Sequence, residues 1–319
     1  PVLPAIAKSD RDPTVFWYEP GRHFVMVRHE EPFDNGSGKT GFAFFTSPNL
    51  LDWTFQSRIG DFNECPDLFE LPVEGGRSGE KKWVLVDASF SYRVGSFDGQ
   101  RFDPETQKLR ADFGASKYAY APQSWKPVPG SGTFPIQMGF LTFPKGNPAE
   151  STWHGQMSFP CELHLKQIAD GLRLCREPIK AIESLYGESN SWRNLSIKPG
   201  QNPLEGVTDD AFDLQADLNL RDARAVEFGI RGETVRYTMT EKKLEIAGIK
   251  APLHLSGERL RIRILVDRSS IEVFADEGQV SASRVVFFEP AKHGFSVAAE
   301  GGEAQIISLV VNSVNSVWK

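Results

Sequence analysis

The stretch Arg259-Leu260-Arg261-Ile262-Arg263-Ile264-Leu265-Val266-Asp267 alternates charged and apolar side chains. Successive side chains of a β-strand point to opposite faces, so the pattern predicts a strand with one wet face and one buried face. Ser270–Ala275 follows the same alternation, and Arg268-Ser269 leaves room only for a tight connection. Together the two runs predict neighbouring antiparallel strands of a β-sandwich.

Further short strands are predicted towards the N-terminus. Apolar runs at 24–27, 41–46, 82–87, 92–97 and 136–141 are separated by turn residues. No segment between residue 14 and about residue 165 has a sustained helical period. Strands at such regular spacing are typical of a sandwich, a barrel or a propeller. Residues 179–189 are interpreted as a linker with a short helical start, which divides the chain into units 1–178 and 190–319.

Composition narrows the classes of function. A chain of 319 residues can bury two cores. Its net charge of −6 argues against a nucleic-acid partner, and no apolar run approaches the length of a membrane helix. The three cysteines suggest no disulfide framework, and neither CxxC nor ligand-spaced histidines are present. We therefore predict no metal and no cofactor.

Two carboxylates stand beside prolines at the starts of predicted strands. Arg11-Asp12-Pro13 precedes the run 14–18, and Glu64-Cys65-Pro66 precedes the run 68–71. Taken singly, each reads as an ordinary turn before a strand. Enzymes that break glycosidic bonds usually use two carboxylates that face one pocket. Asp12 and Glu64 are therefore candidate catalytic residues.

The order of several motifs along the chain strengthens this interpretation. They are Arg11-Asp12-Pro13, Glu64-Cys65-Pro66-Asp67-Leu68-Phe69, Tyr120-Ala121-Pro122-Gln123-Ser124-Trp125, Met157-Ser158-Phe159-Pro160-Cys161-Glu162-Leu163 and Val266-Asp267-Arg268-Ser269-Ser270-Ile271-Glu272-Val273-Phe274. This series resembles glycoside hydrolase family 32, the invertases, inulinases and levanases, over essentially the whole chain. The resemblance implies an all-β fold in which a partial β-propeller, five-bladed in the family, precedes a C-terminal β-sandwich.

The resemblance also implies roles for individual residues. Glu64 takes the place of the general acid/base, and Asp12 that of the transition-state stabiliser that holds fructose hydroxyls. The residues expected to bind substrate are Arg11, Cys65, Tyr120 and Trp153. A general acid must be protonated near neutral pH, so we expect burial or a nearby carboxylate to raise the pKa of Glu64.

The chain departs from the family in three places. The nucleophile of the family is the Asp of a Trp-x-Asn-Asp-Pro-Asn motif, which this sequence lacks. A propeller blade takes roughly 40–50 residues, so the stretch before the linker is too short for five blades. We therefore expect the N-terminal part with the nucleophile to be absent. In addition, Cys161 stands where the family has Arg, and Tyr118 where an acidic residue is usual.

These observations predict a glycoside hydrolase of the β-fructofuranosidase type. It would act on sucrose or fructans such as inulin and levan by a retaining mechanism, and this chain would be inactive alone. The alternatives are a catalytically dead fructan-binding or sensing module, and a chain completed by a partner or by domain exchange. The expected partners are a fructose-containing saccharide and either a second copy or a separate N-terminal segment. The compartment stays undetermined, although the substrate class favours a secreted or periplasmic location.

Overall fold

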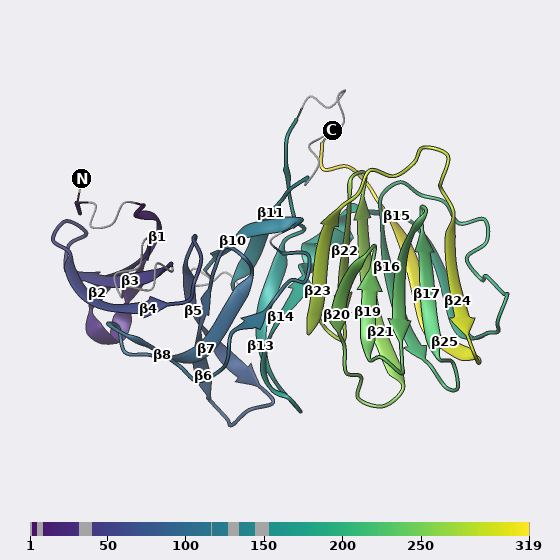
Figure 1. Ribbon diagram of the computed structural model, residues 1–319. Helices are drawn as coiled ribbons and strands as arrows, with labels where there is room; N and C mark the ends of the chain where they lie inside the picture. The colour runs from purple at the N-terminus through teal and green to yellow at the C-terminus, as the bar shows by residue number, and fades with distance from the viewer. Residues whose placement is uncertain are drawn as a thin grey trace. The chain divides into compact units, whose positions relative to one another are not determined.

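The computed structural model describes residues 2–4, 9–31, 40–115, 117–126, 134–143 and 153–318. Within these residues the regular structure consists of β-strands and two short 3₁₀ helices, η1 (Glu19–Gly21) and η2 (Lys180–Leu185) (Figure 1). The prediction of an all-β chain is confirmed. None of the described helices has the length and apolar character needed to span a membrane.

The chain divides into two compact units. The first contains Pro1–Ala111, Tyr120–Phe140 and Glu162–Leu174, and the second contains Asp112–Ala119, Leu141–Cys161 and Cys175–Lys319. Short excursions of the N-terminal half thus belong to the second unit, which the sequence pattern did not indicate.

The first unit begins with a four-stranded antiparallel meander of the kind that forms a propeller blade. Its strands are β1 (Arg11–Tyr18), β2 (His23–Glu30), β3 (Gly41–Ser47) and β4 (Thr54–Gly60). The helix η1 forms the turn between β1 and β2, and Arg22 closes it at φ 50°. The apolar residues of β2 and β3 are buried except for the half-buried Phe24, which agrees with the strands predicted at 24–27 and 41–46.

Two further sheets of similar form follow. One comprises β5 (Asp67–Glu74), β6 (Lys81–Val86), β7 (Ser91–Phe97) and β8 (Phe102–Pro104), with β9 (Leu109–Arg110) paired to β7. The other has the order β10 (Ala119–Trp125), β11 (Ile136–Leu141), β13 (Cys161–Ile168) and β14 (Gly171–Pro178). A short parallel pairing of Leu165 with Val73 joins β13 to β5. The described residues of the first half therefore form three blade-like sheets.

A shared apolar core ties the first two blades together. Its buried members are Val25, Val27, Phe42, Phe44, Phe62, Leu68, Leu85, Phe97 and Phe102. The rings of Phe42 and Phe62 stack with their centroids 5.0 Å apart. Because Phe62 lies two residues before Glu64, this packing anchors the segment that carries the candidate acid.

The second unit contains two sheets that pack as a sandwich. The larger has the order β15 (Tyr186–Ile197), β25 (Ala304–Val314), β16 (Phe212–Asn219), β21 (Arg259–Asp267), β22 (Ser270–Ala275) and β23 (Val280–Val285). The smaller has the order β20 (Ile249–Pro252), β19 (Lys243–Ile246), β18 (Glu233–Thr238), β17 (Ala225–Ile230) and β24 (Phe295–Glu300). The short strand β12 (Gln156–Met157) also belongs to this unit. Strands β21 and β22 pair antiparallel over the predicted residues.

Strand β22 differs from the prediction because both of its faces are buried. The face expected to be wet is covered by Phe159, Cys161, Ile179 and Ile182, which pack with Phe274. Ile179 caps the 3₁₀ helix η2 and Ile182 lies within it, in the segment predicted as a linker, whose last residues from Tyr186 onward belong to β15. Both faces of β22 are therefore buried, and the face that carries the apolar Phe274 also carries the polar side chain of Glu272.

The polar surface of β22 carries a buried hydrogen-bond network. Glu272 Oε1 accepts the N–H of Phe159 at 2.9 Å, and Glu272 Oε2 lies 3.0 Å from Ser283 Oγ. Ser283 Oγ is in turn 2.7 Å from Asp112 Oδ2, which also accepts from Arg176 Nη1 at 2.6 Å. Burial raises the pKa of Glu272 to about 7. When protonated, Glu272 donates to Ser283, and the Ser283 hydroxyl then donates to Asp112, so each of these oxygens has a partner.

The raised pKa of Glu272 predicts a loss of stability as pH increases. The folded state holds this proton more tightly than the unfolded state, so the free energy of unfolding falls between about pH 4.5 and pH 7. The full effect is on the order of 3 kcal/mol. Gln can replace the neutral acid, because its Oε1 accepts from Phe159 and its Nε2 donates to Ser283. We expect Glu272→Gln to match the native protein near pH 4.5 and to exceed its stability at pH 8.

Urea unfolding of the two proteins at several pH values measures this difference. The control is Glu258→Gln, which removes an exposed carboxylate from the turn before β21. It should leave the pH dependence as it is in the native protein. Parallel stability curves for Glu272→Gln and the native protein would contradict the assignment of this proton to Glu272.

Candidate active site

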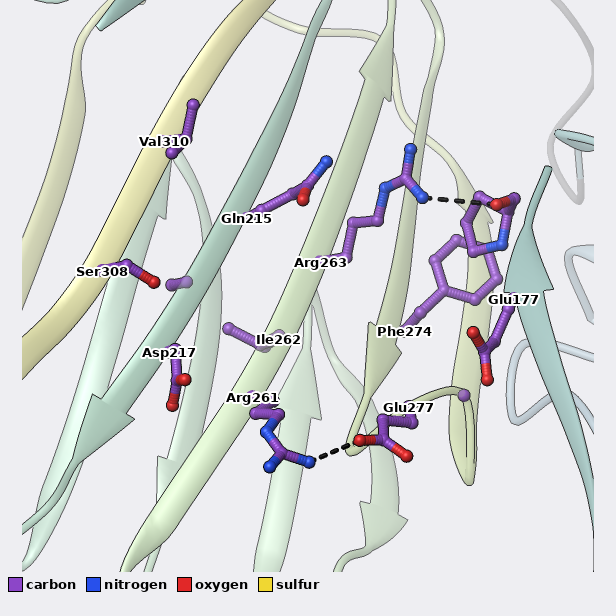
Figure 2. Close-up of a pocket in the computed structure, with 13 residues that line it drawn as sticks. Glu177, Gln215, Asp217, Arg261, Ile262, Arg263, Phe274, Glu277, Ser308 and Val310 are labelled. Carbon is purple, nitrogen blue, oxygen red and sulfur yellow. Dashed lines mark hydrogen bonds and ion pairs between the residues drawn. The ribbon is translucent and has the colours of Figure 1, made fainter. Parts of the chain in front are cut away.

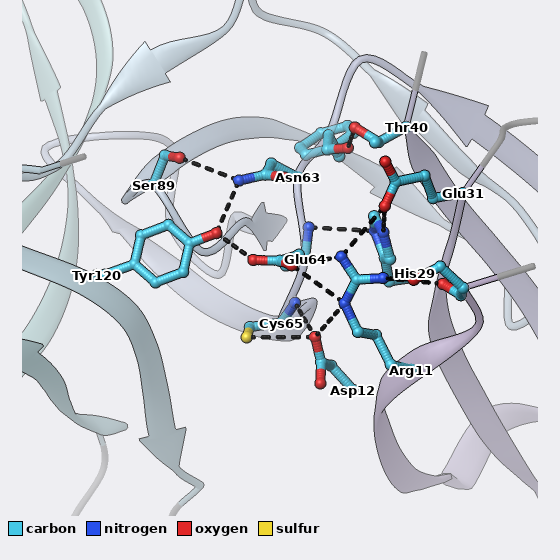
Figure 3. Close-up of polar contacts among 12 residues, drawn as sticks. Arg11, Asp12, His29, Glu31, Thr40, Asn63, Glu64, Cys65, Ser89 and Tyr120 are labelled. Carbon is cyan, nitrogen blue, oxygen red and sulfur yellow. Dashed lines mark hydrogen bonds and ion pairs between the residues drawn. The ribbon is translucent and has the colours of Figure 1, made fainter. Parts of the chain in front are cut away.

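The candidate residues of the first unit come together at the starts of the first strands of three successive blades. Arg11 and Asp12 begin β1, Glu64 and Cys65 immediately precede β5, and Tyr120 is the second residue of β10. Figure 3 shows their side chains converging on Glu64. The sequence separates Glu64 from Arg11 by 53 residues and from Tyr120 by 56, so the blade repeat is what assembles the cluster.

The backbone is strained where it delivers these side chains. Asp12, Glu64 and Cys65 have φ of 54°, 33° and 44°, in the left-handed region that non-glycine residues rarely adopt. Each such conformation costs on the order of 1–3 kcal/mol and persists where surrounding contacts hold it. Here the N–H of Glu64 donates to His29 Nδ1 at 3.1 Å, and the N–H of Cys65 donates to Asp12 Oδ2 at 3.4 Å.

The side chain of Glu64 is held by two donors. Arg11 Nε donates to Glu64 Oε1 at 3.1 Å, Arg11 Nη2 forms an ion pair with the same oxygen, and the Tyr120 hydroxyl donates to Oε2. Asn63 Nδ2 donates to the Tyr120 oxygen at 3.0 Å, which fixes the direction of the tyrosine hydroxyl. The hydrogen bonds from Tyr120 and Arg11 outweigh burial and lower the pKa of Glu64. The prediction that the pKa of Glu64 is raised is therefore wrong for this arrangement.

Asp12 lies beside this pair and remains partly open to solvent. Its Oδ2 is 3.7 Å from Arg11 Nε and 3.6 Å from Cys65 Sγ, and its side chain is 34% exposed. Burial and the neighbouring Asp12 carboxylate raise the pKa of the Cys65 thiol to about 12. Cys65 is therefore a neutral thiol that contacts Asp12, and it is not available as a thiolate nucleophile.

His29 was not singled out from the sequence, yet it is part of this cluster. Register places it opposite Arg11 in the β1–β2 pair, and its ring is completely buried. Burial, and then the charge of Arg11, lower its pKa, so the ring is neutral and Nδ1 accepts the Glu64 N–H. The proton therefore sits on Nε2, which is 3.8 Å from Glu31. Only the strand register reveals this role, because no local motif surrounds His29.

The remaining predicted residues lie in the second unit. Trp153, which is 42% exposed, packs its ring against Phe143 with 5.6 Å between centroids. Cys161 is fully buried against Phe274, and burial raises the pKa of its thiol to about 12. Tyr118 lies under the guanidinium of Arg284 at 5.1 Å. Among the described residues, no cluster of three or more His, Cys, Asp or Glu could hold a metal ion.

Blade-like sheets followed by a β-sandwich are the architecture of one class of glycoside hydrolases. Residues 1–178 match the glycosyl hydrolases family 32 N-terminal domain, and residues 181–313 match the family 32 C-terminal domain. The chain belongs to glycosyl hydrolase family 32. This membership confirms the resemblance and the fold class of a β-propeller portion followed by a β-sandwich.

Individual relatives agree with the family. A levanase of Bacillus subtilis is 31% identical over 366 residues, which cover 100% of this chain and 52% of that protein. A levanase of Bacillus sp. strain L7 is also 31% identical to this chain, and the match covers 37% of that protein. The solved exo-inulinase of Aspergillus awamori superimposes with a TM-score of 0.84 at 22% identity, covering 100% of this chain and 71% of that one. The chain thus spans about half of the Bacillus subtilis levanase and less than half of the strain L7 levanase.

The low pKa of Glu64 gives a prediction about its tyrosine partner. Tyr120→Phe removes a donor to the carboxylate, so we expect the pKa of Glu64 to rise. Carbon-13 NMR of the glutamate carboxyls during a pH titration measures this, with Glu64→Gln identifying the signal. Tyr186→Phe is the matched control, since Tyr186 donates to Asp213 in the second unit. A pKa of Glu64 that is unchanged in Tyr120→Phe would contradict the assigned cause.

Proposed function

We propose that this chain carries two of the three carboxylates of a retaining β-fructofuranosidase that acts on sucrose or fructans. Glu64 is the general acid/base and Asp12 holds fructose hydroxyls, with Arg11, Cys65 and Tyr120 around the sugar. The convergence of these residues at three blade starts carries the proposal (Figure 3). Trp153 is proposed as a further sugar contact from its exposed ring.

The third carboxylate decides whether the chain can catalyse the reaction. A retaining glycosidase needs a nucleophile about 5–5.5 Å from its acid/base. Within the described part of the chain, the side-chain hydrogen bonds of Glu64 come from Arg11 and Tyr120 rather than from a second acid. Both donors favour the ionised form, which cannot protonate a leaving oxygen. We therefore propose that the chain alone is inactive.

A nucleophile placed beside Glu64 would reverse its electrostatic environment. A like charge at about 5 Å raises the pKa of a carboxyl, which is what the general acid requires. We propose that a segment bearing the Trp-x-Asn-Asp-Pro-Asn motif supplies this charge. The proton of Glu64 would then pass to the departing sugar oxygen while the nucleophile forms the fructosyl ester, and Glu64 would later deprotonate the attacking water.

A fructan-binding module without catalysis is the second candidate. The lowered pKa of Glu64 favours it, because a stably ionised carboxylate can accept sugar hydroxyls but cannot act as an acid. Asp12, at 34% exposure, is open to the same hydroxyls. The names of the relatives, levanase and exo-inulinase, support fructans as ligands for either candidate.

We expect no fructose release when the chain is incubated alone with sucrose, inulin or levan. Addition of a polypeptide carrying the family nucleophile motif should produce activity. Glu64→Gln in the complemented protein should then lower kcat by roughly 10²–10⁴-fold, the usual contribution of general acid–base catalysis. Fructose release by the chain alone would contradict the proposal that the chain is inactive by itself. A complemented protein that binds fructan and never hydrolyses it would favour the binding module.

Binding is predicted to depend on Asp12 even where hydrolysis is absent. Titration calorimetry with fructose and short fructans should show weaker binding by Asp12→Ala, because a carboxylate accepts hydrogen bonds from sugar hydroxyls. The control is Asp52→Ala, which removes an exposed aspartate after β3. Equal affinity of Asp12→Ala and the native chain would exclude the sugar-holding role of Asp12.

A further inference from the structure

A cavity of about 290 Å³ opens on the face of the six-stranded sheet that points away from the sandwich core (Figure 2). All of its lining residues belong to the second unit. They come from the three neighbouring strands β25, β16 and β21, with Phe274, Glu277 and Glu177 along one side. The proposed hydrolysis uses none of them.

Strand register arranges the polar groups of this cavity in two rows. Gln215 stands between Val310 and Arg263, and Asp217 stands between Ser308 and Arg261. Both rows lie on paired strands of the sheet, where backbone hydrogen bonds fix the spacing of the side chains. A ligand would thus meet a preformed surface, because its binding groups are carried by strands.

Arg263, Asp217 and Arg261, which line the cavity, each form an ion pair within the second unit. Arg263 makes a forked contact with Asp213, with Nε 3.1 Å from Oδ1 and Nη2 2.6 Å from Oδ2. Arg259 Nε donates to Asp217 at 2.7 Å, and Arg261 donates to Glu277. These pairs leave little net charge in the cavity to attract an ion.

Uncharged hydrogen-bonding groups remain for a ligand. Gln215 uses its amide nitrogen on Tyr186 and Asp213, each at 3.2 Å. Within the described part of the chain, its carbonyl oxygen and the Ser308 hydroxyl have no protein hydrogen-bond partner. Arg261, whose side chain is 42% exposed, has further N–H groups beyond the one on Glu277. Val310 and Pro178 contribute apolar surface to the lining of the cavity.

We infer that this cavity, termed here the sandwich pocket, binds one neutral sugar unit of a fructan chain. Adjacent sugar hydroxyls both donate and accept, which matches an acceptor at Gln215, a donor at Arg261 and a hydroxyl at Ser308. The volume lies at the lower end of ligand pockets and suits one sugar ring. Phe274 is only 3% exposed and offers no open stacking face, so we expect a Kd on the order of 1 mM.

The choice of fructan rests on the proposed function, whereas the neutral character of the ligand rests on the pocket. If the sandwich pocket holds one sugar unit of a fructan, the polysaccharide stays attached to the protein while its other sugar units are free. Two weak contacts on one polymer raise its effective concentration without any new contact at the first site. The sandwich pocket would therefore retain long fructans more than sucrose.

The test separates the two sugar sites in the full chain. The 319-residue chain with Asp12→Ala, which weakens the proposed site of the first unit, is titrated with 1-kestose by calorimetry or NMR. Ser308→Tyr on this background fills the sandwich pocket and should weaken binding by about tenfold or more. Gln215→Ala, which removes one acceptor, should weaken it by roughly fivefold.

The matched control is Ser296→Tyr, on β24 of the other sheet, where Ser296 lies opposite Gly229. It should bind 1-kestose like the parent, and the thermal unfolding of both Tyr variants should match the parent. Loss of binding in Ser308→Tyr but not in Ser296→Tyr supports the sandwich pocket. Binding unaffected by both Ser308→Tyr and Gln215→Ala overturns it. Stronger binding of citrate overturns the neutral ligand, and equal binding of maltotriose overturns the choice of fructan.

Failure of the sandwich pocket and failure of the proposed function give different results. If Asp12→Ala alone removes all binding of 1-kestose, the sandwich pocket is overturned while the site in the first unit stands. If Asp12→Ala has no effect and Ser308→Tyr removes binding, the sandwich pocket is supported and the sugar-holding role of Asp12 fails.

Discussion

The contact of Arg11 with Glu64 is the interaction on which the candidate site depends. It joins the start of one blade to the start of the next, and together with the hydrogen bond from Tyr120 it lowers the pKa of the residue that would act as acid. Arg11 also contacts Glu31 and the carbonyl of Ser9, so its position is set from both sides. A guanidinium stays protonated at any working pH, so the hydrogen bonds from Tyr120 and Arg11 together hold the pKa of Glu64 below its ordinary value.

The blade repeat explains why so few residues suffice to build the site. Each blade contributes the start of its first strand, and the left-handed backbone at Asp12, Glu64 and Cys65 directs the side chains towards one another. The strain is local, and the shared core at Phe42 and Phe62 helps to hold it. A repeat of this kind can gain or lose a functional group by changing a single blade, since the other strand starts keep their own supports.

Sequence alone predicted the strands, because the alternation in β21 and the apolar runs in β2 and β3 record burial directly. It also selected Asp12 and Glu64, since each stands in a recognisable local motif.

His29 could not be found this way, because its role arises from its register with Arg11. The direction of the pKa of Glu64 was also out of reach, since it depends on Tyr120 and Arg11, both more than 50 residues away. The covered face of β22 was missed for the same reason, as Phe159 and Ile182 reach it from distant segments.

Two carboxylates of this chain show what a general acid requires. Glu272 is fully buried, and the cation of its network, Arg176, donates to Asp112, so burial prevails and raises the pKa of Glu272 to about 7. Glu64 is only partly buried and receives Arg11 and Tyr120 directly, so its pKa falls. Burial alone is thus too weak to make Glu64 an acid while these donors remain. A neighbouring carboxylate that draws Arg11 away or repels the charge of Glu64 would supply the difference, so the nucleophile of the proposed mechanism would serve proton transfer as well as attack at carbon.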